Sequence, residues 1–244
     1  FSYNNRVQKL RWMLAMSRNA DGQRYADSCM FLRFTHPHKE ALYSESLWRE
    51  LGPYDSSSHL LQHFNADNAS DMIDRMLYTD VKTRLPDHLL MVGDRMTMAH
   101  SIEGRSPFVD QELVEFVARL PTSYKIHGRR LKYIQREVAR EFLPETLVTR
   151  PKRGFGFPLA YWFRHELRGL MTSVVQDSSL VAAGYFRREA MQALLAEHLS
   201  GHVDHNYRLW LLLNLELWQR TFVERQSRED LRAFLQVGVS AAVS

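Results

Sequence analysis

The sequence predicts a mainly α-helical protein. Apolar side chains recur at helical spacing along most of its 244 residues, whereas no segment alternates apolar and polar residues as a half-buried strand does. No internal repeat is present. A composition of 45% hydrophobic and 25% charged residues is typical of a globular protein and leaves room for one large domain or two small ones.

The N-terminal third predicts two helices followed by a loop. Apolar residues separate onto one face from Val7 to Leu14, and a second helix is expected over residues 21–34. This second helix should end before Pro37, because the residue preceding a proline disfavours helical backbone. Residues 56–68 are rich in Ser, His and Asn, so they predict a loop with one short turn.

The middle third predicts three helices. Residues 70–83 place four apolar side chains on one side, and Pro86 is expected to open the next helix, since proline suits a first turn. Asp110 is expected to cap a helix over residues 112–120, which ends before Pro121.

The C-terminal third predicts four more helices, at residues 131–142, 161–175, 189–199 and 207–224. The last of them is apolar on nearly all sides, which is typical of a buried core helix. Residues 237–244 are small and weakly patterned and predict a disordered tail. We therefore expect one helical region over residues 1–236.

Charge and cysteine content narrow the function classes. The net charge is +4, which suits a phosphate-bearing ligand, but no Lys/Arg block reaches the length of a basic nucleic-acid-binding tail. Cys29 is the single cysteine, so no intrachain disulfide can form and a reducing, cytoplasmic location is expected. No apolar run is long enough to span a bilayer. The chain starts at Phe1 without a signal-peptide pattern, and we expect it to begin inside a longer protein.

Two carboxylates in the segment 94–110 are candidates for chemistry. Glu103 comes just before a rigid Ser-Pro pair and could accept a proton or hold an ammonium group. An ion pair with Arg105 that merely stabilises a loop is the alternative. Asp94 could face a site, or it could pair with Arg95 or Arg105 in a buried network.

A second candidate lies at residues 150–158, where Lys152 and Arg153 precede Gly154. Glycine lets a backbone approach a ligand closely, and lysine offers a mobile charge to phosphate oxygens. The pattern is not that of a Walker loop, and a flexible basic loop is the alternative.

Histidine offers no metal site in the sequence. The pair at residues 36 and 38 has no Cys or Glu at ligand spacing, and the pair that flanks Asp204 predicts a polar loop between helices.

These motifs together resemble the C-terminal synthetase domain of glutamine-dependent asparagine synthetases. Leu-Pro-Asp-His-Leu-Leu at 85–90 and Gly-Asp-Arg-Met-Thr-Met-Ala-His-Ser-Ile-Glu-Gly-Arg-Ser-Pro-Phe-Val-Asp at 93–110 are similar to one family motif. Arg-Pro-Lys-Arg-Gly-Phe-Gly-Phe-Pro at 150–158 is similar to another, in the right order. Gly104 departs from the family pattern, which has valine or alanine there, and Gly93 stands where a bulkier residue is common.

The resemblance implies the helical C-terminal portion of an α/β adenine-nucleotide-hydrolase-like, or ATP-pyrophosphatase, synthetase domain. It implies ATP with Mg2+, a carboxylate substrate such as aspartate, and ammonia derived from glutamine. Glu103 then matches the active-site glutamate and Lys152 the lysine that stabilises pyrophosphate. Arg105, Arg153, Gly154 and Asp94 match positions with supporting or pyrophosphate-binding roles.

Two parts of such an enzyme are absent from residues 1–244: the Ser-Gly-Gly-x-Asp-Ser loop that cradles ATP phosphates and the N-terminal cysteine of the glutaminase domain. We expect both in the same longer chain or in a partner subunit, and we expect the 244-residue chain alone to bind ATP poorly and to be inactive. The alternatives are the same chemistry on another acid, in polysaccharide amidation, β-lactam closure or lasso-peptide closure, or a non-catalytic helical binding module.

Overall fold

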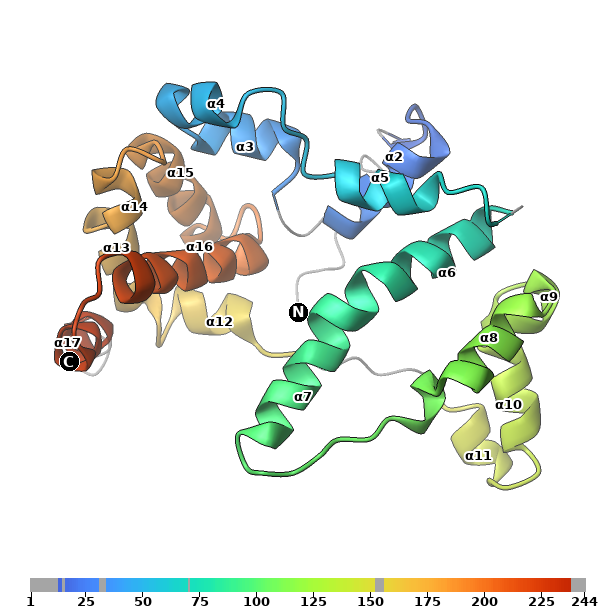
Figure 1. Cartoon of the computed structure of the whole chain (residues 1–244). Helices are drawn as coiled ribbons and strands as arrows, with labels where there is room; N and C mark the ends of the chain where they lie inside the picture. Colours follow the sequence, from blue (N-terminus) through green and yellow to red (C-terminus); the bar gives the residue numbers. More distant parts are fainter. Residues whose placement is uncertain (1–12, 15, 31–33, 70, 152–155, 238–244) are drawn as a thin grey trace. The chain divides into compact units, whose positions relative to one another are not determined.

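The computed structural model describes residues 13–14, 16–30, 34–69, 71–151 and 156–237, apart from the side chains of residues 30 and 237. Within these residues the protein is mainly helical, with a single two-stranded sheet (Figure 1). The chain divides into two compact units, Phe1–Ser56 with Gly156–Ser244 (unit 1) and Ser57–Phe155 (unit 2). Of the expected helix over residues 7–14, only Met13 and Leu14 are described, and both are helical. The expected tail at 237–244 lies outside the described residues except for Val237, which ends α17. The expected extent of one region over 1–236 stays a prediction.

Unit 1 contains the helices that hold the main apolar core. They are α2 (Asp21–Met30), α3 (His36–Leu42), α4 (Glu45–Leu51), α12 (Leu159–Arg164), α13 (Arg168–Gln176), α14 (Ser179–Ala182), α15 (Arg188–Leu199), α16 (Asn206–Trp218), the π-helix η3 (Gln219–Val223) and α17 (Arg228–Val237).

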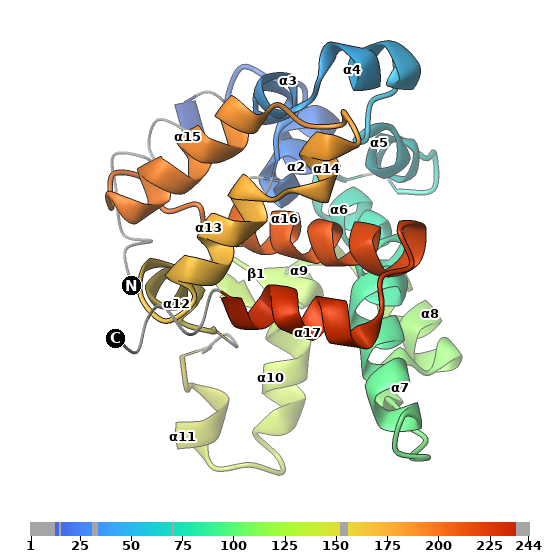
Figure 2. The ribbon, with the colours of Figure 1, turned by 90° about the vertical axis from the view of Figure 1, so that its left-hand side faces the viewer.

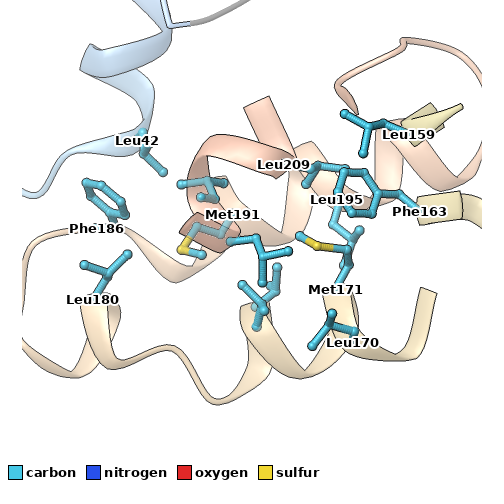
Figure 3. Packing of buried hydrophobic residues seen from close by; sticks show 14 residues of the cluster. Leu42, Leu159, Phe163, Leu170, Met171, Leu180, Phe186, Met191, Leu195 and Leu209 are labelled. Carbon is cyan, nitrogen blue, oxygen red and sulfur yellow. The ribbon is translucent and has the colours of Figure 1, made fainter. Parts of the chain in front are cut away.

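The core of unit 1 forms where the apolar stripes of α13, α15 and α16 meet (Figure 3). On α16 the stripe follows the spacing i, i+3, i+4 through Leu209, Leu212 and Leu213, which places these three side chains on one helix face. Met171 and Met191 are completely buried within the same cluster. The N-terminal helices join this core through a backbone bridge, since Ser44 N donates to Tyr185 O at 2.9 Å and Arg187 N donates to Leu42 O at 2.8 Å.

A buried carboxylate fixes the C-terminal half of unit 1. Glu216 on α16 is fully buried and accepts hydrogen bonds from Ser178 Oγ at 2.9 Å, from Ser179 N at 2.7 Å and from Arg220 Nε at 2.8 Å. The two serines begin α14, so one side chain ties α14, α16 and η3 together.

Two buried histidines, His198 and His205, and the half-buried His38 form a polar cluster where α15 leads into α16. His198 is fully buried and its Nδ1 accepts the backbone N–H of His205 at 3.1 Å. The ring of His205 lies between Glu197, at 2.7 Å from Nε2, and Arg208, at 2.8 Å from Nδ1. His38 on α3 faces the same charges, and burial lowers its pKa to about 4.

Unit 2 contains α5 (Ser58–Phe64), α6 (Met72–Lys82), the π-helix η1 (Leu85–Leu90), α7 (Met91–Met98), the 3-10 helix η2 (Pro107–Val109), α8 (Gln111–Arg119), α9 (Thr122–Lys125), β1 (Ile126–His127), β2 (Arg130–Leu131), α10 (Tyr133–Ala139) and α11 (Glu145–Val148). Two caps confirm the predicted helices at 70–83 and 112–120. Asp71 accepts from Asp74 N at 2.9 Å, and Asp110 accepts from Leu113 N at 3.2 Å.

Several predicted elements were wrong. Residues 58–64 form helix α5 where a loop was predicted, because polar residues there expose one helix side and Phe64 is buried on the other. The predicted helix over 21–34 is present as α2 and ends before Pro37 as expected, but Phe34 is not helical. Pro37 lies in the first turn of α3, where its missing N–H costs nothing. The predicted helix over 161–175 is two helices, α12 and α13, separated at residues 165–167.

One element was not predicted and one prediction was wrong, each for a physical reason that the sequence pattern hides. The hairpin β1–β2 pairs His127 with Arg130 and Ile126 with Leu131, and strands of two residues are too short to show alternation. Its turn begins at Gly128, whose φ of 59° suits the first position of a two-residue hairpin turn. Helix α16 is buried on one side only, because Trp210 and Trp218 on the other side are exposed.

We predict that Met191→Ala lowers the free energy of unfolding of unit 1 by about 2–5 kcal/mol, because it leaves a cavity in a closely packed core. All five tryptophans belong to unit 1, so denaturant unfolding followed by tryptophan fluorescence reports on this unit. Met13→Ala is the matched control, since Met13 is 58% exposed. Equal losses in the two variants would show that Met191 is not part of a rigid core.

We also predict that unit 1 loses stability as the pH falls from about 6.5 towards 4. Burial and then repulsion from Arg164 lower the pKa of His198 from 6.5 to about 4. The neighbouring His205 also lowers this pKa, whereas Asp204 at 3.5 Å opposes the shift. The folded state therefore favours the neutral ring, and stability that is fully present above pH 6.5 is lost as the pH falls through this window.

The pH prediction is measured by denaturant unfolding at several pH values. His198→Gln should flatten the loss of stability between pH 6.5 and 4, whereas His202→Gln, at an exposed histidine, should leave the slope unchanged. Identical slopes for the three proteins would contradict the assignment.

Candidate functional site

The candidate site begins on a nearly continuous helical run, α6–η1–α7 (Figure 1). Pro86 cannot donate a backbone N–H and clashes with the carbonyl four residues earlier, so an α-helical pattern cannot pass through it unchanged. The run widens here into a π turn, in which Met91 N donates to Pro86 O. Pro86 is thus near the start of a helical element, as predicted, but only Thr83 interrupts the run between α6 and this turn.

Helix α7 ends in a geometry that turns the chain sharply into the loop containing Glu103. Ile102 N donates to Thr97 O at 3.1 Å and Ser101 N donates to Met98 O at 3.0 Å, which is a Schellman motif. Ser101 occupies the left-handed position of this motif with a φ of 58°. The loop is closed on its other side by Pro107, the first residue of η2.

Glu103 and Arg105 come together in this loop. Arg105 Nη2 donates to Glu103 Oε2 at 3.1 Å, and the two side chains are 83% and 67% exposed, respectively. An exposed ion pair contributes at most about 1 kcal/mol to stability, so this pair stabilises the loop only weakly. The arrangement leaves the carboxylate of Glu103 accessible and restrains it through one guanidinium group.

Asp94 is exposed on α7, so it does not belong to a buried ionic network, which was one of its two predicted alternatives. Among the described residues its carboxylate forms no ion pair. Its backbone carbonyl accepts from Thr97 Oγ1 at 3.1 Å, and the same hydroxyl donates to Gly93 O at 3.0 Å. A Cβ added at Gly104 would lie 3.3 Å from Thr97 Oγ1, so glycine lets the loop approach this turn of α7 closely.

Lys152, Arg153 and Gly154 lie outside the described residues, and their predicted contact with pyrophosphate stays a prediction. Arg150 and Gly156, on either side of this segment, are exposed.

The histidine pairs lack the arrangement of a metal site. His36 and His38 lie in helix α3, although the proline between them had suggested a loop. His36 Nε2 lies 3.4 Å from Glu40 Oε1 in this helix. His205 belongs to the polar cluster, whereas His202 contacts Ser200 Oγ at 2.8 Å. No group of three or more His, Cys, Asp or Glu side chains in the described ranges could hold a metal ion. Sequence reasoning missed His198, because a lone histidine in an amphipathic helix carries no signal of its burial.

No helix in the described part of the chain has the length and apolar character that a membrane crossing requires.

Comparisons with known proteins place the chain in a family. The asparagine synthase family model matches residues 2–220. Glutamine-hydrolyzing asparagine synthetase 1 of Bacillus subtilis is 27% identical over 164 residues, which are 67% of this chain and 26% of the relative. A relative from Mycobacterium bovis is 36% identical over 155 residues, 63% of this chain and 24% of its own length. Amidase chry2 of Gibberella zeae is 29% identical over 122 residues, 47% of this chain and 18% of that protein.

No solved structure matches the chain. The matched relatives are much longer, and the chain spans about a quarter of the length of the first two. The family model covers most of the chain, including the segments around Glu103 and Lys152. The chain therefore belongs to the asparagine synthase family and forms a mainly helical part of such a domain.

Proposed function

We propose that this chain is part of an enzyme that forms amides with ATP. A carboxylate oxygen of the substrate attacks the α-phosphorus of ATP, an acyl-adenylate forms, and pyrophosphate leaves. Ammonia derived from glutamine then attacks the acyl carbon, AMP leaves, and a proton is released from the amine nitrogen. Aspartate, which gives asparagine, is the proposed acid. Membership of the asparagine synthase family supports this reaction class.

The accessible Glu103–Arg105 pair is the observation that carries the proposal. An attacking amine must lose a proton, and a nearby carboxylate can accept it or hold the ammonium form beforehand. Glu103 is exposed, and the partner of its carboxylate among the described residues is an exposed guanidinium, so an ammonium group can displace this partner at little cost. The helix end at Ser101 and the rigid Pro107 limit how far the carboxylate can move.

Lys152 is proposed to stabilise the leaving pyrophosphate. Negative charge builds on the leaving group as the bond to the α-phosphorus breaks, and a positioned cation lowers the energy of that state. Arg153 adds a second cation, and Gly154 allows the backbone to approach the phosphates. Asp94 is assigned a supporting role near Glu103.

Mg2+ is proposed to arrive with the ATP phosphates. The described residues offer no cluster of three metal-binding side chains, which fits an ion held mainly by the nucleotide. The phosphate-cradling loop and the glutaminase are proposed to lie in the same longer chain or in a partner subunit, and the enzyme to act in the cytoplasm. The 244-residue chain alone is proposed to bind ATP weakly.

The test measures pyrophosphate release from ATP and amide formation by the longest natural protein that contains this chain. Aspartate, other carboxylic acids and no acid are compared. Lys152→Ala should slow pyrophosphate release by about a hundredfold, the usual loss when one group that stabilises transition-state charge is removed. Lys82→Ala removes an exposed lysine from α6 and is the matched control.

Glu103→Gln separates the two half-reactions. It should lower amide formation by about a hundredfold and pyrophosphate release by much less, because the proposed proton acceptor acts after adenylation. Glu115→Gln is the matched control, since Glu115 also lies in unit 2 and pairs with an exposed arginine, Arg119, at 3.6 Å.

Each outcome has a distinct meaning. Release that depends on a different acid keeps the mechanism and replaces aspartate as the substrate. No acid-dependent release with any acid would overturn the proposal in favour of a non-catalytic helical module. Equal effects of Glu103→Gln and Glu115→Gln on amide formation would show that Glu103 takes no part in the reaction.

A further inference from the structure

A basic pocket lies in unit 2, at the hairpin β1–β2 and helices α10 and α11. Its volume is about 490 Å³, within the range of about 300–1,000 Å³ that is usual for small-molecule sites. Figure 2 shows α9 next to β1 and α10, and α9 is in close contact with both. None of the residues that line the pocket belongs to the proposed catalytic set.

The pocket walls carry four guanidinium groups and only two carboxylates. Both carboxylates are already engaged by a single arginine: Arg140 pairs with Glu137 and, through Nε, with Glu145 at 3.0 Å. These contacts raise the pKa of Arg140 further above its ordinary value. Four guanidinium groups and two carboxylates give the wall a net charge of +2, and both carboxylates pair with Arg140 and not with the other three arginines.

Those three arginines are Arg129, Arg130 and Arg136. In the described ranges, none of them forms an ion pair, and Arg136 Nη1 donates to the carbonyl of Val148 at 2.7 Å. Arg129 and Arg130 are exposed and adjacent in the chain, at the end of the hairpin. The left-handed Gly128 makes the tight turn that brings them to this end.

The remaining wall is partly apolar. Leu131 is exposed, and the ring of Tyr133 stacks on His127 with centroids 4.9 Å apart and an interplanar angle of 28°. Stacking on His127 restrains the Tyr133 ring, which is part of the pocket lining. The site thus combines a net positive charge with one restrained aromatic face.

We propose that this pocket binds a small organic phosphate. The planar guanidinium fork matches phosphate oxygens in two parallel hydrogen bonds, which suits two adjacent arginines at a concave surface. Tyr133 and Leu131 would contact the organic part of the ligand. The proposal concerns a binding site outside the proposed catalytic residues and does not depend on the amide-forming activity.

The test uses calorimetric titration of the 244-residue chain carrying Lys152→Ala and Arg153→Gln, which together remove both cations of the proposed catalytic pyrophosphate contact. Inorganic pyrophosphate is the first probe. Arg129→Gln with Arg130→Gln should weaken its binding at least tenfold. Arg84→Gln with Arg119→Gln changes the net charge equally at exposed arginines outside the pocket and should weaken it less than twofold.

Two further comparisons, of lysine variants and of a second pair of ligands, make the test more specific. Arg129→Lys with Arg130→Lys keeps the charge and the exposed surface but removes the fork, so an intermediate loss is expected and unfolding cannot explain it. Phenyl phosphate compared with inorganic phosphate distinguishes an organic phosphate from a simple anion. Tighter binding of phenyl phosphate, reduced by Tyr133→Ala, supports the proposed ligand class.

Three results would overturn the proposal. Equal weakening by the two glutamine double variants would show a general charge effect. Equal affinity for phenyl phosphate and inorganic phosphate would show that the pocket does not recognise the organic part of a ligand. Binding of a long polyanion such as heparin without binding of pyrophosphate would favour a macromolecular partner.

Discussion

The arrangement of unit 1 depends on the polar contacts of the buried Glu216 carboxylate. A fully buried carboxylate is stable only if charge and hydrogen-bond partners compensate its lost hydration. Its partners come from the start of α14 and from Arg220, and the guanidinium of Arg220 also lies 3.9 Å from the centre of the Phe234 ring on α17. The apolar core determines which face of α16 is buried, and the Glu216 carboxylate determines which elements this helix contacts.

Unit 2 is held together differently, by helix caps and by individual polar contacts between helices. Helices α7, α8 and α10 contain no buried residue, so apolar burial contributes less there than in unit 1. Helix caps and the pair between Lys125 Nζ and Asp74 Oδ1 at 2.7 Å supply local order instead, and this lysine is almost buried. The proposed catalytic loop and the proposed phosphate pocket both belong to this sparsely packed unit.

Structural features that recur at every helical turn could be predicted from the sequence, whereas features that depend on a single residue could not. Periodic apolar spacing predicted α6, α8, α15 and α16, because a helix face must satisfy the same burial requirement every turn. The spacing of Glu103 and Arg105 also predicted their ion pair, because two charged residues that are two positions apart in a short loop stay close to each other. The buried Glu216 was not predicted, because a carboxylate within an apolar run has the same pattern whether it faces solvent or core. The hairpin at Gly128 was missed because four paired residues leave no periodic signal.

Glu216 and Glu103 show how the surroundings of one residue type decide its use. Both contact an arginine, at 2.8 Å and 3.1 Å. Removing the partner of Glu216 would leave a buried charge uncompensated, so that contact must persist and the residue can only be structural. Glu103 loses little when Arg105 moves away, because water replaces the guanidinium. A carboxylate that must exchange one cation for another during a reaction has to lie in such a setting, and in this chain Glu103 has it.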